Sequence, residues 1–585
     1  LIFKKLILLL SILLFFTNQS IAADVTIFSD DSSDYSFTNG DTLAIKNVSE
    51  ASGKLIFSGS TTITGIDNND EISGEINSAA VTSLTVEVSI TNNNLLISGQ
   101  VNINGSLTKI GNGILTLSGT STYKGATTIS AGTLTVSGTL SNSTDVVNSG
   151  TYNVNNSDTI QSLSGSGNTV IASSQTLTTG DSGNDEVSGV ISGSGAFTKA
   201  GSGILTLSDD NTYTGVTTIN AGTLTVSGTL SNSTAVSVAS GATYDVDQTD
   251  TVASIEGSGN IEIASSKTLT AGDGNDKISS GVISGAGALT KAGSGVLTLS
   301  GTNTYTGNTT VSEGTLEIQG QLENGNYDGS IANSGTLAIN SSSNQTLAGV
   351  ISGNGTLTKS SSGTLTLSGN NTYIGITTIN AGTLKVSGTL ADRTAVTIAS
   401  GATYDVDASD TVASIEGAGN IDIASSKTLT AGDSNNKTSS GVISGSGALT
   451  KAGSGTQTLS GNNTYTGATT ISAGTLTVSG TLSNSTAVSV ASGATYDVDA
   501  SDTVASIEGA GNIEIASSQT LTAGDGNDKT ISGDISGSGG LTKIGSGTQT
   551  LSGNNTYTGV TTINTGTLKL TGSLSDSTAV SIASG

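Results

Sequence analysis

The sequence predicts an all-β fold, a parallel β-helix with about 23 residues per coil, and three observations support this. One phrase recurs along the chain; it reads NTYTGVTTINAGTLTVSGTL at residues 211–230 and NTYTGATTISAGTLTVSGTL at residues 463–482. Within it, Leu476 and Val478 alternate with threonines, the pattern of a strand with one buried face. The 585 residues include no proline, and a strand that is paired on both sides needs its amide N–H groups.

The predicted coil length comes from the spacing of one tyrosine in the repeated phrase. Its six copies are 90, 92, 68, 92 and 92 residues apart. Four coils of about 23 residues fill 92 residues, and the short interval lacks 92 − 68 = 24 residues, which predicts one deleted coil. The stretch TVASIEGAGNIDIASSKTLTAGD at residues 411–433 has no counterpart in that interval. The six tyrosines are Tyr123, Tyr213, Tyr305, Tyr373, Tyr465 and Tyr557.

Residues 1–22 have the pattern of a secretory signal peptide. Lys4 and Lys5 precede an apolar run at residues 6–16, and the small residues Ser20 and Ala22 stand at the two positions that a signal peptidase reads. An apolar run this short does not span a bilayer. We therefore expect a mature chain that starts near residue 23 and is secreted across the inner membrane.

The composition excludes several classes of function. The chain contains no His, Cys, Met or Trp, which rules out Ser-His-Asp and Cys-His nucleophile systems, zinc fingers, haem ligation and disulfides. It carries 19 basic residues, two of them in the signal peptide, and 45 acidic residues, so the mature chain has a net charge of 17 − 45 = −28. This charge argues against a nucleic-acid partner. We expect no enzymatic activity, no catalytic residue and no cofactor.

A longer phrase, LTKAGSGTQTLSGNNTYTGATTISAGTLTV at residues 449–478, closely resembles the autotransporter-associated β-strand repeat. That repeat occurs in passenger domains of type V secreted proteins of Gram-negative bacteria. The resemblance implies a right-handed β-helical passenger that an outer-membrane β-barrel translocator exports to the cell surface or the extracellular space. It also implies a ligand on a host, a surface or a matrix. The six copies start at Leu107, Phe197, Leu289, Leu357, Leu449 and Leu541, and the third has diverged most.

The repeats divide the mature chain into two regions. Residues 23–105 are strand-like but less regular, and we expect them to form an N-terminal β-helical region that caps the coils. Residues 106–585 hold the six copies. The chain stops at SIASG, where other copies continue into ATYDVD, so we expect a C-terminal truncation and a translocator that is a missing domain or a separate protein. The early aromatic residues are Phe28, Tyr35, Phe37 and Phe57.

Two copies of the sequence GDGNDK are the strongest candidates for a metal site, because they resemble the calcium-binding nonapeptide of β-roll proteins. In those proteins, turns nine residues apart share each ion. Here one copy, either GDGNDK or a relative such as DSGNDE at residues 181–186 or GDSNNK at residues 432–437, occurs per repeat of about 90 residues, which is too far apart for sharing. We therefore expect polar turns between strands and no metal site. The calcium candidates are Asp273, Asp276, Asp525 and Asp528.

Carboxylates also recur in the sequence YDVD, with a third aspartate nearby. Alternation places the first two carboxylates of each set on one face, where a pair could serve acid–base catalysis or bind a cation. Because the sets recur in near-identical form, we expect a solvated face and not a catalytic site. The sets are Asp245, Asp247 and Asp250; Asp405, Asp407 and Asp410; and Asp497, Asp499 and Asp502.

A lysine recurs in the LTK sequence that opens each copy. We expect these cations to moderate the self-repulsion of an acidic surface. The lysines are Lys109, Lys199, Lys291, Lys359, Lys451 and Lys543.

Three hypotheses for function follow. The first is an exported surface protein, structural or adhesin-like, whose repetitive face is the functional surface. The second is a β-helical polysaccharide-active enzyme, which would show a polar cluster that does not repeat. The third is an exoprotein that a separate outer-membrane partner secretes.

Overall fold

The computed structural model of the chain has two units, residues 1–253 and 254–585. It describes the strands at residues 25–27, 35–37, 42–45 and 55–57, and residues 61–65, 70–78, 81, 83–89, 91 and 93–583. In this part of the chain, no helix has the length and apolar character needed to cross a membrane. The predicted signal peptide at residues 1–22 lies outside the described residues, as do the side chains of the early aromatic residues.

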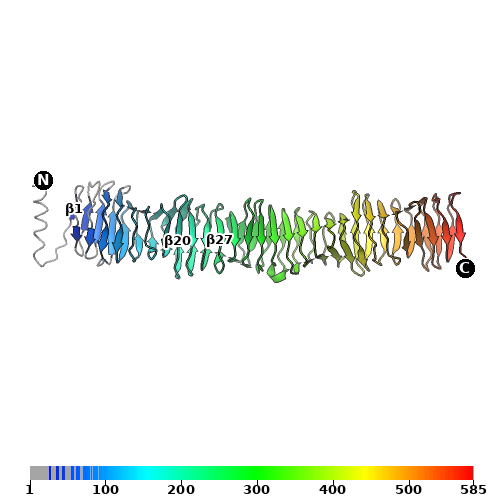
Figure 1. Cartoon of the computed structure of the whole chain (residues 1–585), viewed down its shortest axis with the longest axis horizontal. Helices are drawn as coiled ribbons and strands as arrows, with labels where there is room; N and C mark the ends of the chain where they lie inside the picture. Colours follow the sequence, from blue (N-terminus) through cyan, green and yellow to red (C-terminus); the bar gives the residue numbers. More distant parts are fainter. Residues whose placement is uncertain are drawn as a thin grey trace, which may run out of the picture. The chain divides into compact units, whose positions relative to one another are not determined.

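Parallel strands build both units. Unit one runs from β1 (Val25–Ile27) to β29 (Asp250–Val252), and unit two from β30 (Ser254–Gly257) to β72 (Val580–Ile582). Figure 1 shows the strands of unit two, coloured from green to red, stacked side by side. A single turn of 3-10 helix, η2 (Glu323–Gly325), is the one helical element in the described residues. The predicted all-β parallel β-helix is confirmed.

Each coil has three sides, and each side carries either one strand or a single β-bridge to the neighbouring coil, such as that between Asn462 and Thr481. In unit two, β61 pairs with β64, β62 with β65 and β63 with β66, all in parallel. The three sheets therefore grow together as the chain winds. These strands are β61 (Thr495–Val498), β62 (Asp502–Val504), β63 (Ser506–Gly509), β64 (Asn512–Ile515), β65 (Thr520–Ala523) and β66 (Lys529–Ile531).

Register partners on successive coils are 17 to 25 residues apart, and the predicted length of about 23 lies within this range. In one sheet of unit two, five successive pairings lead from Ile471 to Leu570. These five coils take 570 − 471 = 99 residues. The individual steps differ in length, because some sides are turned by longer corners. An interval of 92 residues therefore spans about 4⅔ coils, since 92 / 19.8 is about 4.6.

The short interval holds three strands fewer than the others. From Tyr305 to Tyr373 the chain advances nine strands, from β37 (Thr309–Val311) to β46 (Thr377–Ile379). From Tyr373 to Tyr465 it advances twelve strands, from β46 to β58 (Thr469–Ile471). With three sides per coil, the three missing strands correspond to about the one coil that the spacing predicted.

The interior of each unit is a stack of side chains, one layer per coil. Leu476 and Val478 are buried, as the alternation predicted. In unit one, Leu115, Leu134 and Tyr152 are register partners on successive coils and are all buried. Each fully buried aliphatic side chain contributes about 1.5–3 kcal/mol. The repeated sequence thus supplies the same core layer several times.

Candidate functional surface

The tyrosine that marks each repeat is an interior residue. In the fifth copy, the Tyr465 hydroxyl lies 2.5 Å from Oγ1 of Thr469, at the start of β58 (Thr469–Ile471), and both residues are buried. Buried Asn463 completes this corner: its Oδ1 accepts the N–H of Ile443 at 3.0 Å, and its Nδ2 donates to the carbonyl of Thr481 at 3.0 Å. The phrase NTY therefore fixes the corner between successive coils.

The lysine of each LTK sequence is buried, which corrects the expectation of a surface cation. Lys451 donates from Nζ to the carbonyl oxygens of Ala452, Gly453 and Ala473, at 2.5, 2.9 and 3.0 Å. Three carbonyls satisfy the three N–H donors of the ammonium group, so the charge is held inside the corner. Burial lowers the pKa of all six lysines: Lys109 to about 8, and likewise Lys199, Lys291, Lys359, Lys451 and Lys543.

The third aspartate of each YDVD set is buried too, whereas the first two face outward. Asp502 accepts the N–H of Leu482 and the hydroxyl of Tyr496, each at 3.0 Å. In the divergent third copy, Gln345 takes this place and accepts the N–H of Leu322 at 2.8 Å. In the first copy, which reads YNVN, Asp158 takes this place and accepts the N–H of Leu140 and the hydroxyl of Tyr152. Burial raises the pKa of Asp158 and Asp410 to about 6, and it also raises the pKa of Asp250 and Asp502. Only the outward pairs form the solvated face that we expected.

Each repeat turns a ladder of hydroxyl groups outward. Register pairing places one hydroxyl on each successive coil, about 4.8 Å from the next. In the fifth copy the ladder is Thr430, Thr450, Thr470 and Ser489. In the sixth copy it is Thr522, Thr542, Thr562 and Ser581.

The ladders of successive copies lie on different sides of the solenoid. An interval of about 4⅔ coils is one third of a turn short of five full turns. With three sides per coil, each copy therefore lies one side away from the previous copy. The equivalent strands β46 (Thr377–Ile379), β58 (Thr469–Ile471) and β70 (Thr561–Ile563) accordingly belong to three different sheets. Unit two therefore presents equivalent surfaces in three directions.

The calcium candidates lie in turns, where their carboxylates accept hydrogen bonds from backbone N–H groups. Asp273 accepts the N–H of Asn275 at 2.8 Å, and Asp276 accepts the N–H of Val296 on the next coil at 2.9 Å. Asp525 and Asp528 make the same bonds to Asn527 and Thr548. Burial acts to raise the pKa of Asp273, but the hydrogen bonds from Asn275 and the nearby Lys277 outweigh it and lower that pKa. Among the described residues, no three carboxylates are grouped to hold a metal ion.

Comparison with protein families matched one family, the passenger-associated-transport-repeat. The match recurs six times, each time over one copy of the repeat whose interior and ladder are described above. The six repeats and the parallel β-solenoid are those of an autotransporter passenger domain. Comparison with curated proteins and with solved structures found no match. The matched residues are 107–136, 197–226, 289–318, 357–386, 449–478 and 541–570.

The surface of the passenger carries recurring ion pairs between neighbouring coils. Lys277 lies 2.9 Å from Glu256, and Lys437 lies 2.9 Å from Glu416. The lysine of GDGNDK thus reaches back to the glutamate of SIEG on the preceding coil. Such half-exposed pairs contribute roughly 0–1 kcal/mol each to stability. They therefore add little to the stability of the fold.

The buried lysine and aspartate were missed although alternation in the sequence signalled the inward orientation of both. In LTK the leucine faces inward, so alternation also turns the lysine at position 451 inward. Alternation alone does not predict a buried lysine, because lysine is rarely buried without a partner. The partners are backbone carbonyls, which sequence patterns do not reveal. Asp502 carried the same signal, because in β62 it alternates with the inward-facing Val504. Its partner is the main-chain N–H of Leu482, 20 residues earlier, which sequence patterns do not reveal either.

Proposed function

We propose that the passenger is exported and acts at the cell surface as a structural or adhesin-like β-solenoid, with its repetitive outer face as the working surface. The observation that carries this proposal is the difference between the buried and the outward polar groups of the repeats. The polar groups that could take part in chemistry, such as Lys451 and Asp502, are hydrogen-bonded to backbone groups inside the coil. The groups that the repeats expose to solvent are the threonine and serine hydroxyls of the ladders.

The same observation argues for a role without catalysis. The outward carboxylate pairs recur in step with the repeat, and they are engaged by neighbouring side chains. In the fourth copy, Lys385 contacts Asp405 at 3.3 Å and also contacts Asp407; in the fifth copy, Thr477 donates to Asp497 at 2.9 Å. A single catalytic centre would need a polar cluster that occurs once.

Export suits a chain of this composition. Because it has no cysteine, no covalent loop forms in an oxidising compartment, and an unfolded chain remains free to pass through a translocator. A parallel solenoid then grows by adding one coil at a time to the last. The proposed partner is accordingly an outer-membrane translocator, and the proposed location is the cell surface or the medium.

Protease treatment of intact producing cells tests the location. We expect peptides of residues 106–583 to be released from the surface, or to be found in the medium, while a cytosolic marker protein stays intact. Release of these peptides only after cell lysis would contradict the proposal. Comparing adhesion of producing cells with that of a strain that lacks the gene tests the adhesin-like role, and equal adhesion would contradict that part alone.

A further inference from the structure

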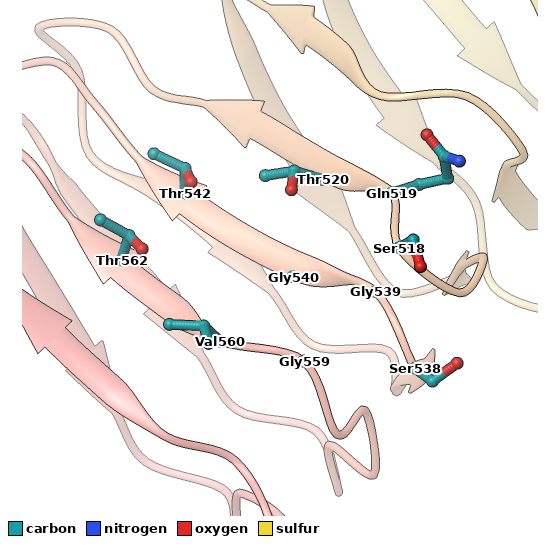
Figure 2. A pocket seen from close by; sticks show the side chains of 10 residues that line it. All are labelled: Ser518, Gln519, Thr520, Ser538, Gly539, Gly540, Thr542, Gly559, Val560 and Thr562. Carbon is teal, nitrogen blue, oxygen red and sulfur yellow. The ribbon is translucent and has the colours of Figure 1, made fainter.

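A shallow hollow lies beside the hydroxyl ladder of the sixth copy. Its floor is the backbone of Gly539, Gly540 and Gly559, and Val560 borders one side. Figure 2 shows the side chains of Thr542 and Thr562 on neighbouring strands along one edge, while Thr520 lies on the preceding strand as the register partner of Gly540. Ser518, Gln519 and Ser538 complete the rim. Every lining residue is uncharged.

The hollow exists because Gly540 has no side chain. Gly540 occupies the outward position of β68 (Gly540–Lys543), between Thr520 of the preceding coil and Val560 of the next. A methyl group there would stand 3.7 Å from Oγ1 of Thr520 and 2.7 Å from the carbonyl oxygen of Val560. Alanine at this position therefore fills the floor of the hollow.

The other copies supply internal controls. The second copy has the same amide and the same valine, Gln175 and Val216, but Ala196 stands in place of Gly540. The fifth copy has Lys427 in place of the glutamine and Ala448 in place of the glycine. The sixth copy thus combines an open floor with an uncharged rim.

We propose that this hollow binds one ring of an uncharged glycan. Threonine and serine hydroxyls and the Gln519 amide can both donate and accept hydrogen bonds, as the hydroxyls of a sugar require. The flat Gly539–Gly540 backbone and the Val560 methyls offer a surface for the apolar C–H face of the ring. The hollow measures about 250 Å³, below the roughly 300–1,000 Å³ of pockets for drug-sized ligands, which suits a single ring.

Charge decides against other ligands. An anionic glycan would approach a chain with a net charge of −26, and no lysine lines the hollow to offset the repulsion. A metal cation would find no carboxylate in the lining. The proposal adds a ligand class to the proposed surface function. It rests on that function only in one respect, namely that the chain meets its ligand at the cell surface.

Saturation-transfer NMR on the purified chain tests the proposal with defined probes: oligomers of glucose and of N-acetylglucosamine, and oligogalacturonate as the anionic comparison. We expect a signal from at least one neutral oligomer, and a loss of at least about fivefold in Gly540→Ala. The reciprocal change, Ala196→Gly, opens the second copy and should raise the signal. Gly540→Ala is compatible with folding because Ala196, Ala288 and Ala448 occupy the equivalent position.

Three results would overturn the proposal: no signal from any neutral oligomer, an unchanged signal in Gly540→Ala, or a preference for oligogalacturonate. Failure of the surface function is detected separately, by protease treatment of intact cells. A chain that binds the neutral oligomer but is absent from the surface would refute the location and leave the hollow's assignment standing.

Discussion

In the fifth copy of the repeat, residues 449–478, Lys451 donates to three carbonyls and the Tyr465 hydroxyl contacts Thr469. In the sixth copy, residues 541–570, Lys543 and Tyr557 make the same contacts. The outer faces differ, because alanines at 448 and 468 are replaced by Gly540 and Val560. The interior polar groups thus define the coil, while the outward positions are free to vary.

Among the substitutions that test this comparison, removal of an interior lysine should lower stability the most. Lys109→Met keeps the bulk of the side chain but leaves the carbonyls of Ile110, Gly111 and Ala131 without their donor. We expect the local opening free energy to fall by about 2–4 kcal/mol, measured by hydrogen exchange in these coils. Lys124→Met, on the surface of the same copy, is the matched control and should change it by less than about 0.5 kcal/mol. Equal effects would mean that the buried cation does not hold the corner.

The buried aspartates should make the chain more stable in mild acid. The pKa of Asp158 and Asp410 is raised to about 6 by burial, so folding favours their protonated forms. This contribution is fully present below about pH 4 and is lost as the pH rises through 6. We expect a higher unfolding temperature at pH 5 than at pH 7.5, and a smaller difference in Asp158→Asn/Asp410→Asn.

The control for the acid effect is Asp499→Asn, which removes an outward carboxylate from the surface. It should leave the difference between the two pH values as it is in the unchanged chain. A chain that is less stable at pH 5 than at pH 7.5 would contradict the assignment of Asp158 and Asp410 as buried carboxyls that favour protonation.

The tyrosine hydroxyls should have equal effects in the two copies. Tyr465→Phe and Tyr557→Phe each remove one hydrogen bond to a threonine, at Thr469 and Thr561. A net loss of about 1 kcal/mol is expected for each, read from hydrogen exchange around β58 and β70. Both tyrosine side chains are fully buried, so clearly different effects at the two positions would show that the interiors of the two copies are not equivalent.

The surface glycine should have the smallest effect on stability. Gly540→Ala reduces the freedom of the unfolded chain, but the carbonyl of Val560 must shift to receive a methyl group 2.7 Å away. The second copy accommodates the same pair as Ala196 and Val216, so we expect a net change in stability of less than about 1 kcal/mol. Thermal unfolding followed by circular dichroism measures this. A loss above about 2 kcal/mol, outside the usual range for a surface substitution, would place Gly540 among the residues that define the coil.

The strands and the buried aliphatic layers could be predicted from the sequence, because alternation is a local signal. Leu476 and Val478 face inward as expected. The tyrosine spacing was read as a whole number of coils, whereas corners of different length make it about 4⅔, so the mean coil is somewhat shorter than that spacing suggested. The roles of Lys451 and Asp502 could not be predicted, since both depend on main-chain groups that folding brings to them. The hollow at Gly540 likewise depends on neighbours from the coils before and after it.

The central claim is a parallel solenoid whose coils are held in register, with successive copies turned to different sides. Spin labels can test it directly, because the chain has no cysteine of its own. Thr450 and Thr470 are register partners on adjacent coils, whereas Ala473 lies three positions further along the chain. Adjacent strands lie about 4.8 Å apart, while three further positions add roughly 10 Å. We predict strong spin–spin broadening for labels at 450 and 470 and weak broadening at 450 and 473; the reverse would contradict the account.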